Sequence, residues 1–503
     1  MKGSFRMNDK ERIFGIKDKL GYLFGDLGND FTFLFSSSFL MKFYTDIMGV
    51  SAGVVGIVMM VARIVDAFTD VAMGRICDKS KTTSNGKFRP WIRRMSGPVA
   101  IASFLMYQGS LSDMPYYFKV VYLFVTYILW GSVFYTSINI PYGSMASSIS
   151  PEPGDRQSLS TFRTLGGMLA GAIVTAGVPL IAFKKDTALG IDVIDSTRFT
   201  IAAAVFSLLA VICYLLCFSL TTERVHSTPT AEASADNNVF VMLKNALKNR
   251  ALISIIAASV VMLLAQLTMQ QMANYVYPVT YSNAKMISLS TVLMTGGMAI
   301  AAIVAKPLAH RFGKAEVSVI SNLFAGVVTL LLYFVRPENV YVFIAFQGVS
   351  WIGLGVFAMV SWALITDVID YSEIRNGIRE DGSVYALYSF ARKLGQAASA
   401  GLVGILLQLV GYSDATAFDP SVTQSIFNIS TLVPAFGFAA LALILWFWYP
   451  LHKKRVDRNV ELLQEKRKQT ERLATKHPDV NASVSAEPNA ELAQPSPQKP
   501  KKK

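Results

Sequence analysis

Two aspartates, Asp66 and Asp70, lie in the middle of a strongly apolar stretch, VMMVARIVDAFTDVAMG. A carboxylate at the depth of a bilayer costs about 2.5–3.5 kcal/mol on insertion scales, so such residues usually have a function. The spacing i, i+4 places both carboxylates on one face of a helix, together with Arg63. We interpret this cluster as a cation site that faces a water-filled interior.

A second pair of aspartates, Asp26 and Asp30, has the same spacing within FGDLGNDFTF. Asp26 lies near one end of its apolar stretch, where simple hydration explains it as well as a function does. Asp30 lies deeper, and we expect it to be functional. Arg163, which follows DRQSLSTF, also needs a partner at membrane depth, and the candidates are Asp30 and the two aspartates of the first cluster.

Neutral polar groups lie in FYTSINIPYGSM, which supplies the hydroxyl of Thr136 and the amide of Asn139. Pro141 removes a backbone donor, so a kink there can expose a carbonyl oxygen. Neutral oxygens beside two carboxylates suit a hard cation such as Na⁺, whereas a proton needs only a buried carboxylate. The alternative is that these hydroxyls bond only within their own helix.

Lys393 lies within VYALYSFARKLGQAASA, on the helical face of Ser389 and, approximately, of Tyr385 and Gln396. We expect Arg392 to point elsewhere. An amine beside hydroxyl and aromatic groups suits a sugar, because the sugar hydroxyls take hydrogen bonds and the apolar face of the ring packs on an aromatic side chain. The alternative is that Lys393 only extends toward the membrane surface.

Long apolar stretches must position these residues. The chain has 503 residues, 52% of them hydrophobic and 16% charged, and the charges crowd between the apolar stretches. This composition predicts an all-α membrane protein with twelve transmembrane helices. The stretches cover about 21–47, 51–77, 95–112, 117–148, 160–183, 199–220, 250–278, 287–308, 316–335, 339–366, 384–411 and 428–450.

A polar segment, 221–249, divides the chain into two halves of six helices, 21–220 and 250–451. Such a repeat is typical of transporters whose site lies at the midplane between the halves. Lys and Arg gather after the second, sixth and eighth stretches. This distribution predicts that the N-terminal segment 1–20, the dividing segment and the tail 452–503 are cytoplasmic.

The formal net charge of +13 follows the same loop pattern, so it indicates topology rather than nucleic-acid binding. In the tail we expect a short charged helix over about 453–475, followed by disorder. The three cysteines and four histidines show no metal-ligand spacing, and no nucleophile–base pair is evident, so we do not expect an enzyme. No cleavable signal peptide is evident, and we expect the first stretch to stay in the membrane.

Two charged segments, DKSKTTSNGKFRPW and DVIDYSEIRNGIRED, are placed where the cytoplasmic ends of the two halves would meet. Salt bridges there would hold one face closed and break during a conformational change. For the individual lysines, topology-setting charge is a strong alternative. The candidate gate residues are Asp78, Arg89, Asp370, Glu373 and Arg379.

Several long strings, in order along the chain, resemble the glycoside–pentoside–hexuronide:cation symporters, a branch of the major facilitator superfamily that includes the melibiose permeases. The resemblance covers nearly all of 15–450 and is carried by GYLFGDLGNDF, VARIVDAFTDVAMGRICDKS, ILWGSVFYTSINIPYGSM and GIREDGSVYALYSFARKLGQA. It implies the major facilitator fold, with two pseudo-symmetric six-helix bundles. It also implies that Asp66 and Asp70 bind the coupling cation, with Thr136 as a further ligand.

The same resemblance implies where the sugar binds and where this chain departs from the family. The implied sugar contacts are Asp30, Arg163 and Tyr135, with Lys393 linking the sugar and cation regions. Thr69, a further candidate cation ligand, stands where sodium-using melibiose permeases have an asparagine ligand, so the cation stays open between H⁺ and Na⁺. Asn139 replaces a sugar-binding aspartate and Gly143 replaces a tryptophan, so specificity for α-galactosides is not implied.

We therefore expect a secondary active transporter of the inner membrane that moves a glycoside, pentoside or hexuronide inward with H⁺ or Na⁺. We expect no other cofactor, a sugar and membrane lipid as partners, no nucleic acid, and a monomer as the functional unit. The alternatives are a cation-coupled lysophospholipid carrier and a membrane sugar sensor that does not transport.

Overall fold

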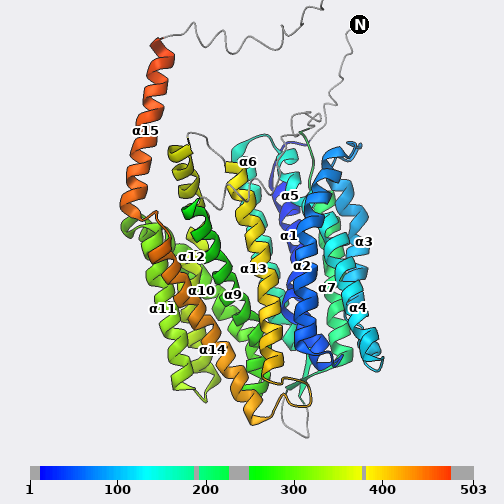
Figure 1. Ribbon diagram of the computed structural model, residues 1–503. Coiled ribbons are helices and arrows are strands. Elements are labelled where there is room, and N and C mark those ends of the chain that lie inside the picture. Colours follow the sequence, from blue (N-terminus) through cyan, green and yellow to red (C-terminus); the bar gives the residue numbers. More distant parts are fainter. Residues whose placement is uncertain (1–11, 186–191, 226–248, 377–380, 477–503) are drawn as a thin grey trace, which may run out of the picture.

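The computed structural model describes residues 12–185, 192–225, 249–376 and 381–476. Within them the chain is almost entirely helical, and the long helices run side by side in two bundles (Figure 1). The first bundle contains α1 (Ile16–Asp46), α2 (Ala52–Lys79), α3 (Arg89–Leu105), α4 (Tyr116–Ile128), the π-helix η2 (Leu129–Tyr135), α5 (Thr136–Ile149), α6 (Pro153–Ala182) and α7 (Ser196–Leu220). A short 3₁₀ turn, η1 (Gly109–Leu111), follows α3, and a small antiparallel hairpin, β1 (Phe183–Lys185) and β2 (Asp192–Ile194), joins α6 to α7.

The second bundle follows the segment that divides the chain, most of which lies outside the described residues. It contains α9 (Arg250–Tyr275), η3 (Val276–Thr280), α10 (Met286–Phe312), α11 (Lys314–Val335), α12 (Val340–Asn376), α13 (Asp381–Leu409), α14 (Pro420–Leu443) and η4 (Ile444–Trp448). A polar helix, α15 (Lys453–Lys476), then extends away from the bundle (Figure 1). It matches the charged helix expected over about 453–475.

Within the described residues, the two bundles contain the twelve long helices that the sequence predicts, because α4, η2 and α5 form one continuous rod. By length and composition, nine rods of the described chain are apolar enough to cross a membrane. The other three are α1, α3 and α13. α1 and α13 carry charged residues in their interior, and α3 has only 17 residues. Packing inside the bundles, rather than apolarity alone, therefore places these three helices.

The two bundles meet closely at the end of the molecule where α1 and α13 end, which we call the far end (Figure 1). The opposite end, from which α15 extends, is called the α15 end. A buried apolar cluster crosses the seam at the far end, and it includes Phe39 and Phe43 of α1, Tyr275 of α9 and Leu407 of α13. A second cluster fills the interior of the second bundle. The far end is thus packed as one core.

Small residues let α2 and α13 cross at close range near the far end. A Cβ atom at Gly56 would lie 2.8 Å from the carbonyl oxygen of Ala400 and 3.0 Å from Cα of Gly404. Side chains at these two glycines would force the helices apart. This backbone-to-backbone approach is the membrane-helix packing that small residues allow.

Polar contacts also join the bundles at the far end. Lys42 Nζ donates to the hydroxyl of Tyr412 at 2.7 Å and forms an ion pair of 2.6 Å with Asp46. The Tyr412 hydroxyl lies 3.0 Å from Asp46 Oδ1, and both charged side chains are buried. Asn274 Nδ2 donates to the carbonyl of Ser38 at 2.6 Å. We call Lys42, Asp46 and Tyr412 the far-end latch.

Candidate functional site

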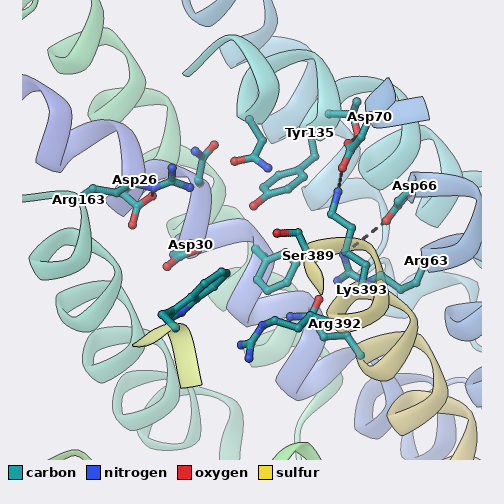
Figure 2. Close-up of a pocket in the computed structure, with 16 residues that line it drawn as sticks. Asp26, Asp30, Arg63, Asp66, Asp70, Tyr135, Arg163, Ser389, Arg392 and Lys393 are labelled. Atoms are coloured by element: carbon teal, nitrogen blue, oxygen red, sulfur yellow. Dashed lines mark hydrogen bonds and ion pairs between the residues drawn. The ribbon is translucent and has the colours of Figure 1, made fainter. Parts of the chain in front are cut away.

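A cavity of about 290 Å³ lies between the two bundles (Figure 2). Its volume is near the lower end of the usual range for small-molecule sites, roughly 300–1,000 Å³. Eight of its sixteen lining side chains are charged, which is costly at membrane depth unless the groups are paired or meet a polar ligand. The lining residues are Asp26, Asn29, Asp30, Phe33, Arg63, Asp66, Asp70, Tyr135, Thr136, Asn139, Arg163, Trp362, Ser389, Arg392, Lys393 and Gln396.

The expected carboxylate pair of α2 faces this cavity, and each carboxylate accepts from a hydroxyl of the next rod. Ser132 Oγ donates to Asp66 Oδ1 at 2.5 Å, and Thr136 Oγ1 donates to Asp70 Oδ1 at 2.8 Å. Both carboxylate side chains are 13% exposed. Two hydroxyls spaced i, i+4 thus match two carboxylates spaced i, i+4.

The two hydroxyls lie at the π-helix η2. Ser132 lies within its seven residues and Thr136 follows it directly. Thr136 Oγ1 also donates to the carbonyl of Gly131, five residues earlier, at 3.1 Å. π-helical turns inside α-helical rods occur frequently at functional sites. Sequence reasoning identified Thr136 but not Ser132, because LWGSVFY has the apolar pattern of any membrane helix.

Cations of both bundles complete the carboxylate cluster. Arg63 Nη1 lies 3.4 Å from Asp66 Oδ2, and its guanidinium packs 4.5 Å from the centre of the Phe33 ring. Lys393 Nζ of α13 forms an ion pair with Asp70 Oδ2 (Figure 2). Asp70 is therefore shared between the bundles, bonded to Thr136 on its own side and to Lys393 across the cavity.

Thr69 does not belong to this group. Its Oγ1 donates to the backbone carbonyl of Asp66 at 3.1 Å, and the residue is not among those that line the cavity. This is the bond within the helix that threonine hydroxyls commonly make. The hydroxyl beside the carboxylates comes instead from Ser132.

The second aspartate pair, on α1, meets Arg163 of α6, and here the expected partner is wrong. Arg163 Nε donates to Asp26 Oδ1 at 3.0 Å rather than to Asp30 or to α2. α1 and α6 both begin at the α15 end, and Asp26 and Arg163 lie equally far along their helices. They therefore share a depth. Asp26 is thus a paired cavity residue rather than a hydrated one.

Gly167 allows α6 to approach these carboxylates. A Cβ atom there would lie 2.9 Å from Asp30 Oδ2 and 3.0 Å from Asp26 Oδ2. Tyr135 and Asn139 line the cavity as expected, and Tyr135 stacks on Phe33 with ring centres 5.7 Å apart. The first bundle thus presents carboxylates, an amide and an aromatic face to one space.

The second bundle contributes Trp362 of α12 and four residues of α13. The α13 residues are Ser389, Arg392, Lys393 and Gln396. Their spacing of three, four and seven residues is that of one helical face. The expectation that Arg392 points elsewhere is therefore wrong, because it shares this face with Lys393. The side chain of Tyr385 lies outside the described part of the chain.

The candidate gate residues remain a prediction. The side chains of Asp78 and Arg379 lie outside what the structure describes. Asp370 and Glu373 lie in the last turns of α12, at the α15 end. Arg89 bonds within the first bundle, where its Nε donates to the carbonyl of Phe218 at 3.1 Å.

Comparison with known proteins places this geometry in a family. A family model described as MFS/sugar transport protein matches residues 21–453. The glucuronide carrier protein homolog of Escherichia coli strain K12 is 30% identical over 458 residues, which are 90% of this chain and 96% of that protein. The inner membrane symporter YicJ of the same strain is 30% identical over 464 residues, 91% of this chain and 96% of that protein.

Solved structures agree on the fold. The structure of a D-xylose-proton symporter superposes with a TM-score of 0.60 at 16% identity, over 86% of this chain and 97% of that one. Members of the matched family are transporters rather than enzymes. The chain is a multi-pass membrane protein that belongs to the MFS/sugar transport protein family and has the major facilitator fold.

Proposed function

We propose that this sugar transporter is a symporter that couples uptake of a glycoside, pentoside or hexuronide to H⁺ or Na⁺ by alternating access. The observation that carries the proposal is the position of Asp70, which bonds to Thr136 of one bundle and to Lys393 of the other. A cation that binds Asp66 and Asp70 competes with Lys393 for the same carboxylate. Occupancy of the cation site is thereby linked to an ion pair between the bundles.

The sugar would bind in the remaining cavity, beside Asp30, Arg163, Tyr135 and Asn139. Once Lys393 is released from Asp70, its ammonium group is available to donate a hydrogen bond to a sugar hydroxyl. Each ligand then favours the arrangement that the other needs, which is the thermodynamic meaning of coupling. The similarity to proteins named as a glucuronide carrier and as a symporter supports the proposal.

Orientation follows from the charge of the loops. With both termini in the cytoplasm, the far end faces outward, and the packed seam there closes the cavity to the outside. The structure then represents a state that is sealed outward. After sugar and cation are released to the cytoplasm, the far end would open to the outside, as alternating access requires.

Uptake into proteoliposomes tests the proposal. Labelled sugars would be offered with a pH gradient and a sodium gradient imposed separately. We expect Asp70→Asn to abolish accumulation against a concentration gradient, because the variant removes the charge that the cation neutralises. Asp113→Asn, in an exposed loop at the far end, is the matched control and should accumulate sugar like the unmodified protein. Full accumulation by Asp70→Asn would overturn the proposal.

The charged lining favours a sugar over a lysophospholipid. An acyl chain needs a continuous apolar slot, whereas half of the lining side chains here are charged. A sensor that binds without transporting would show saturable sugar binding and no flux in the same vesicles.

A further inference from the structure

The charges of the cavity do not all pair with one another. Four carboxylates and four cationic side chains line it. Three pairs account for six of them, namely Arg63–Asp66, Arg163–Asp26 and Lys393–Asp70. Asp30 of α1 and Arg392 of α13 remain. Within the described chain, no ion pair joins either residue to another side chain.

Aromatic rings hold Arg392 in place. Its Cζ lies 5.7 Å from the centre of the Trp362 ring and 5.8 Å from that of Tyr388. Tyr388 is itself buried, and its hydroxyl accepts a hydrogen bond from Ser259 Oγ at 2.7 Å. Ring faces attract a guanidinium but do not accept its in-plane N–H groups. The donors of Arg392 are therefore left for another partner.

A guanidinium at membrane depth without a carboxylate is costly unless something in the cavity pairs with it. Its planar fork of N–H donors matches a carboxylate bidentately, which a sugar hydroxyl cannot do. Asp30 is a hydrogen-bond acceptor and suits hydroxyl groups. Figure 2 shows Arg392 and Asp30 at the same cavity, on helices of different bundles. The two unpaired groups therefore match a ligand with a carboxylate and several hydroxyls.

We propose that Arg392 binds the carboxylate of a sugar acid and makes hexuronides the preferred substrate class. This inference rests on the proposed function, and it selects one of the three sugar classes named there. The hydroxyls of the same molecule donate to Asp30. Because the two contacts come from α13 and α1, one bound hexuronide bridges the two bundles.

Charge balance supports the choice. The eight charged side chains of the lining sum to zero when all are ionised. One monovalent cation at Asp66 and Asp70 leaves the cavity with one excess positive charge, and one hexuronide removes it. The cavity that holds both ligands is then neutral. A neutral cavity costs less free energy to enclose at membrane depth while the bundles change conformation. Transport with one cation per hexuronide moves no net charge.

The test compares two sugars that differ only at C6, methyl β-glucuronide and methyl β-glucoside. The protein in proteoliposomes should take up the glucuronide with the lower KM, and imposing a membrane potential should not change the rate. Hydrogen bonds to charged groups contribute about 1.5–3 kcal/mol, and each 1.4 kcal/mol is tenfold. Arg392→Gln should therefore raise the KM for glucuronide relative to glucoside by about 10- to 100-fold. Arg392→Lys should restore part of this preference.

Arg336→Gln is the matched control. Arg336 also lies over a tyrosine, 5.2 Å from the centre of the Tyr333 ring, but outside the cavity. Its variant should keep the glucuronide preference. If a variant expresses but transports slowly, isothermal titration calorimetry of the purified protein measures the Kd for each sugar, and the ratio of the two Kd values gives the same preference.

The outcomes separate this inference from the proposed function. Equal KM values for both sugars, or an unchanged ratio in Arg392→Gln, would overturn the role of Arg392 and leave a sugar symporter standing. Uptake of neither sugar under any cation gradient would count against the proposed function itself. A current that accompanies glucuronide uptake would contradict the neutral loaded cavity.

Discussion

The far-end latch offers the sharpest prediction about alternating access. Tyr412→Phe removes one hydroxyl and keeps the ring, which packs at 4.9 Å against the Tyr275 ring and lies 5.3 Å from Lys42 Nζ. The lost hydroxyl accepts from Lys42 at 2.7 Å and donates to Asp46 at 3.0 Å. These bonds exist only while the two bundles touch at the far end, because Lys42 and Asp46 belong to α1 and Tyr412 follows α13.

The size of the effect follows from the charges involved. A hydrogen bond to a charged group contributes about 1.5–3 kcal/mol. The Lys42–Asp46 ion pair of 2.6 Å stays in the variant and keeps both charges paired, so we take the value of a single bond. Tyr412→Phe should therefore shift the equilibrium toward the state open at the far end by about 10- to 100-fold.

Distances between spin labels measure this shift. Labels on Asp113→Cys and Ala415→Cys, both exposed at the far end and on different bundles, should show a new longer-distance population in Tyr412→Phe. The native cysteines, Cys77, Cys213 and Cys217, are buried and so contribute little labelling.

Tyr281→Phe is the control for that measurement, because its hydroxyl donates to the Pro337 carbonyl at 2.9 Å within the second bundle. Identical distance distributions in Tyr412→Phe and the unmodified protein would refute the reasoning. A shift of equal size in Tyr281→Phe would refute it as well.

Two further predictions concern the latch and the cation cluster. Burial and the nearby Asp46 raise the pKa of the Asp414 carboxyl in the closed far end, with Lys42 opposing them, so the closed state binds the proton more tightly. Closure should therefore weaken as pH rises from the ordinary aspartate range through the raised pKa, and Asp414→Asn should flatten this dependence in the same distance measurement. With H⁺ as the coupling cation, Ser132→Ala should lower its half-saturating concentration by about tenfold, because the hydrogen bond from Ser132 stabilises the ionised Asp66 and its loss favours the protonated form. Thr69→Ala should change it less than twofold in the same uptake assay, and the opposite ranking would contradict the assignment of Ser132.

Hydropathy predicted the twelve rods because each must satisfy its backbone within itself while it crosses the bilayer. The cost of buried charge pointed to Asp66 and Asp70, and the shared helical face with Ser389 pointed to Lys393. Other features depend on information that periodicity does not carry. The π-helix that presents Ser132 has no distinct apolar pattern, and the contact between Lys42 and Tyr412 depends on how two bundles sit against each other.

The partner of Arg163 and the direction of Arg392 could both have been predicted correctly from the sequence. Counting residues from the expected helix starts, about 21 and 160, would have placed Arg163 nearer in depth to Asp26 than to Asp30, because both helices were expected to begin at the same end. Placing Ser389, Arg392 and Gln396 on one helical wheel would have turned Arg392 toward the cavity.

The polar helix α15 acts as a lever on the second bundle. Its start is fixed there, because the backbone N–H of Lys453 donates to Glu316 Oε1 of α11 at 2.8 Å and Arg455 lies over the Tyr371 ring of α12 at 5.1 Å. A helix of 24 residues is about 36 Å long. Each degree by which the second bundle rotates would move the C-terminal end of α15 by roughly 0.6 Å. Small rocking inside the membrane is thus amplified into a displacement outside it, where a fused helical reporter could follow the transport cycle.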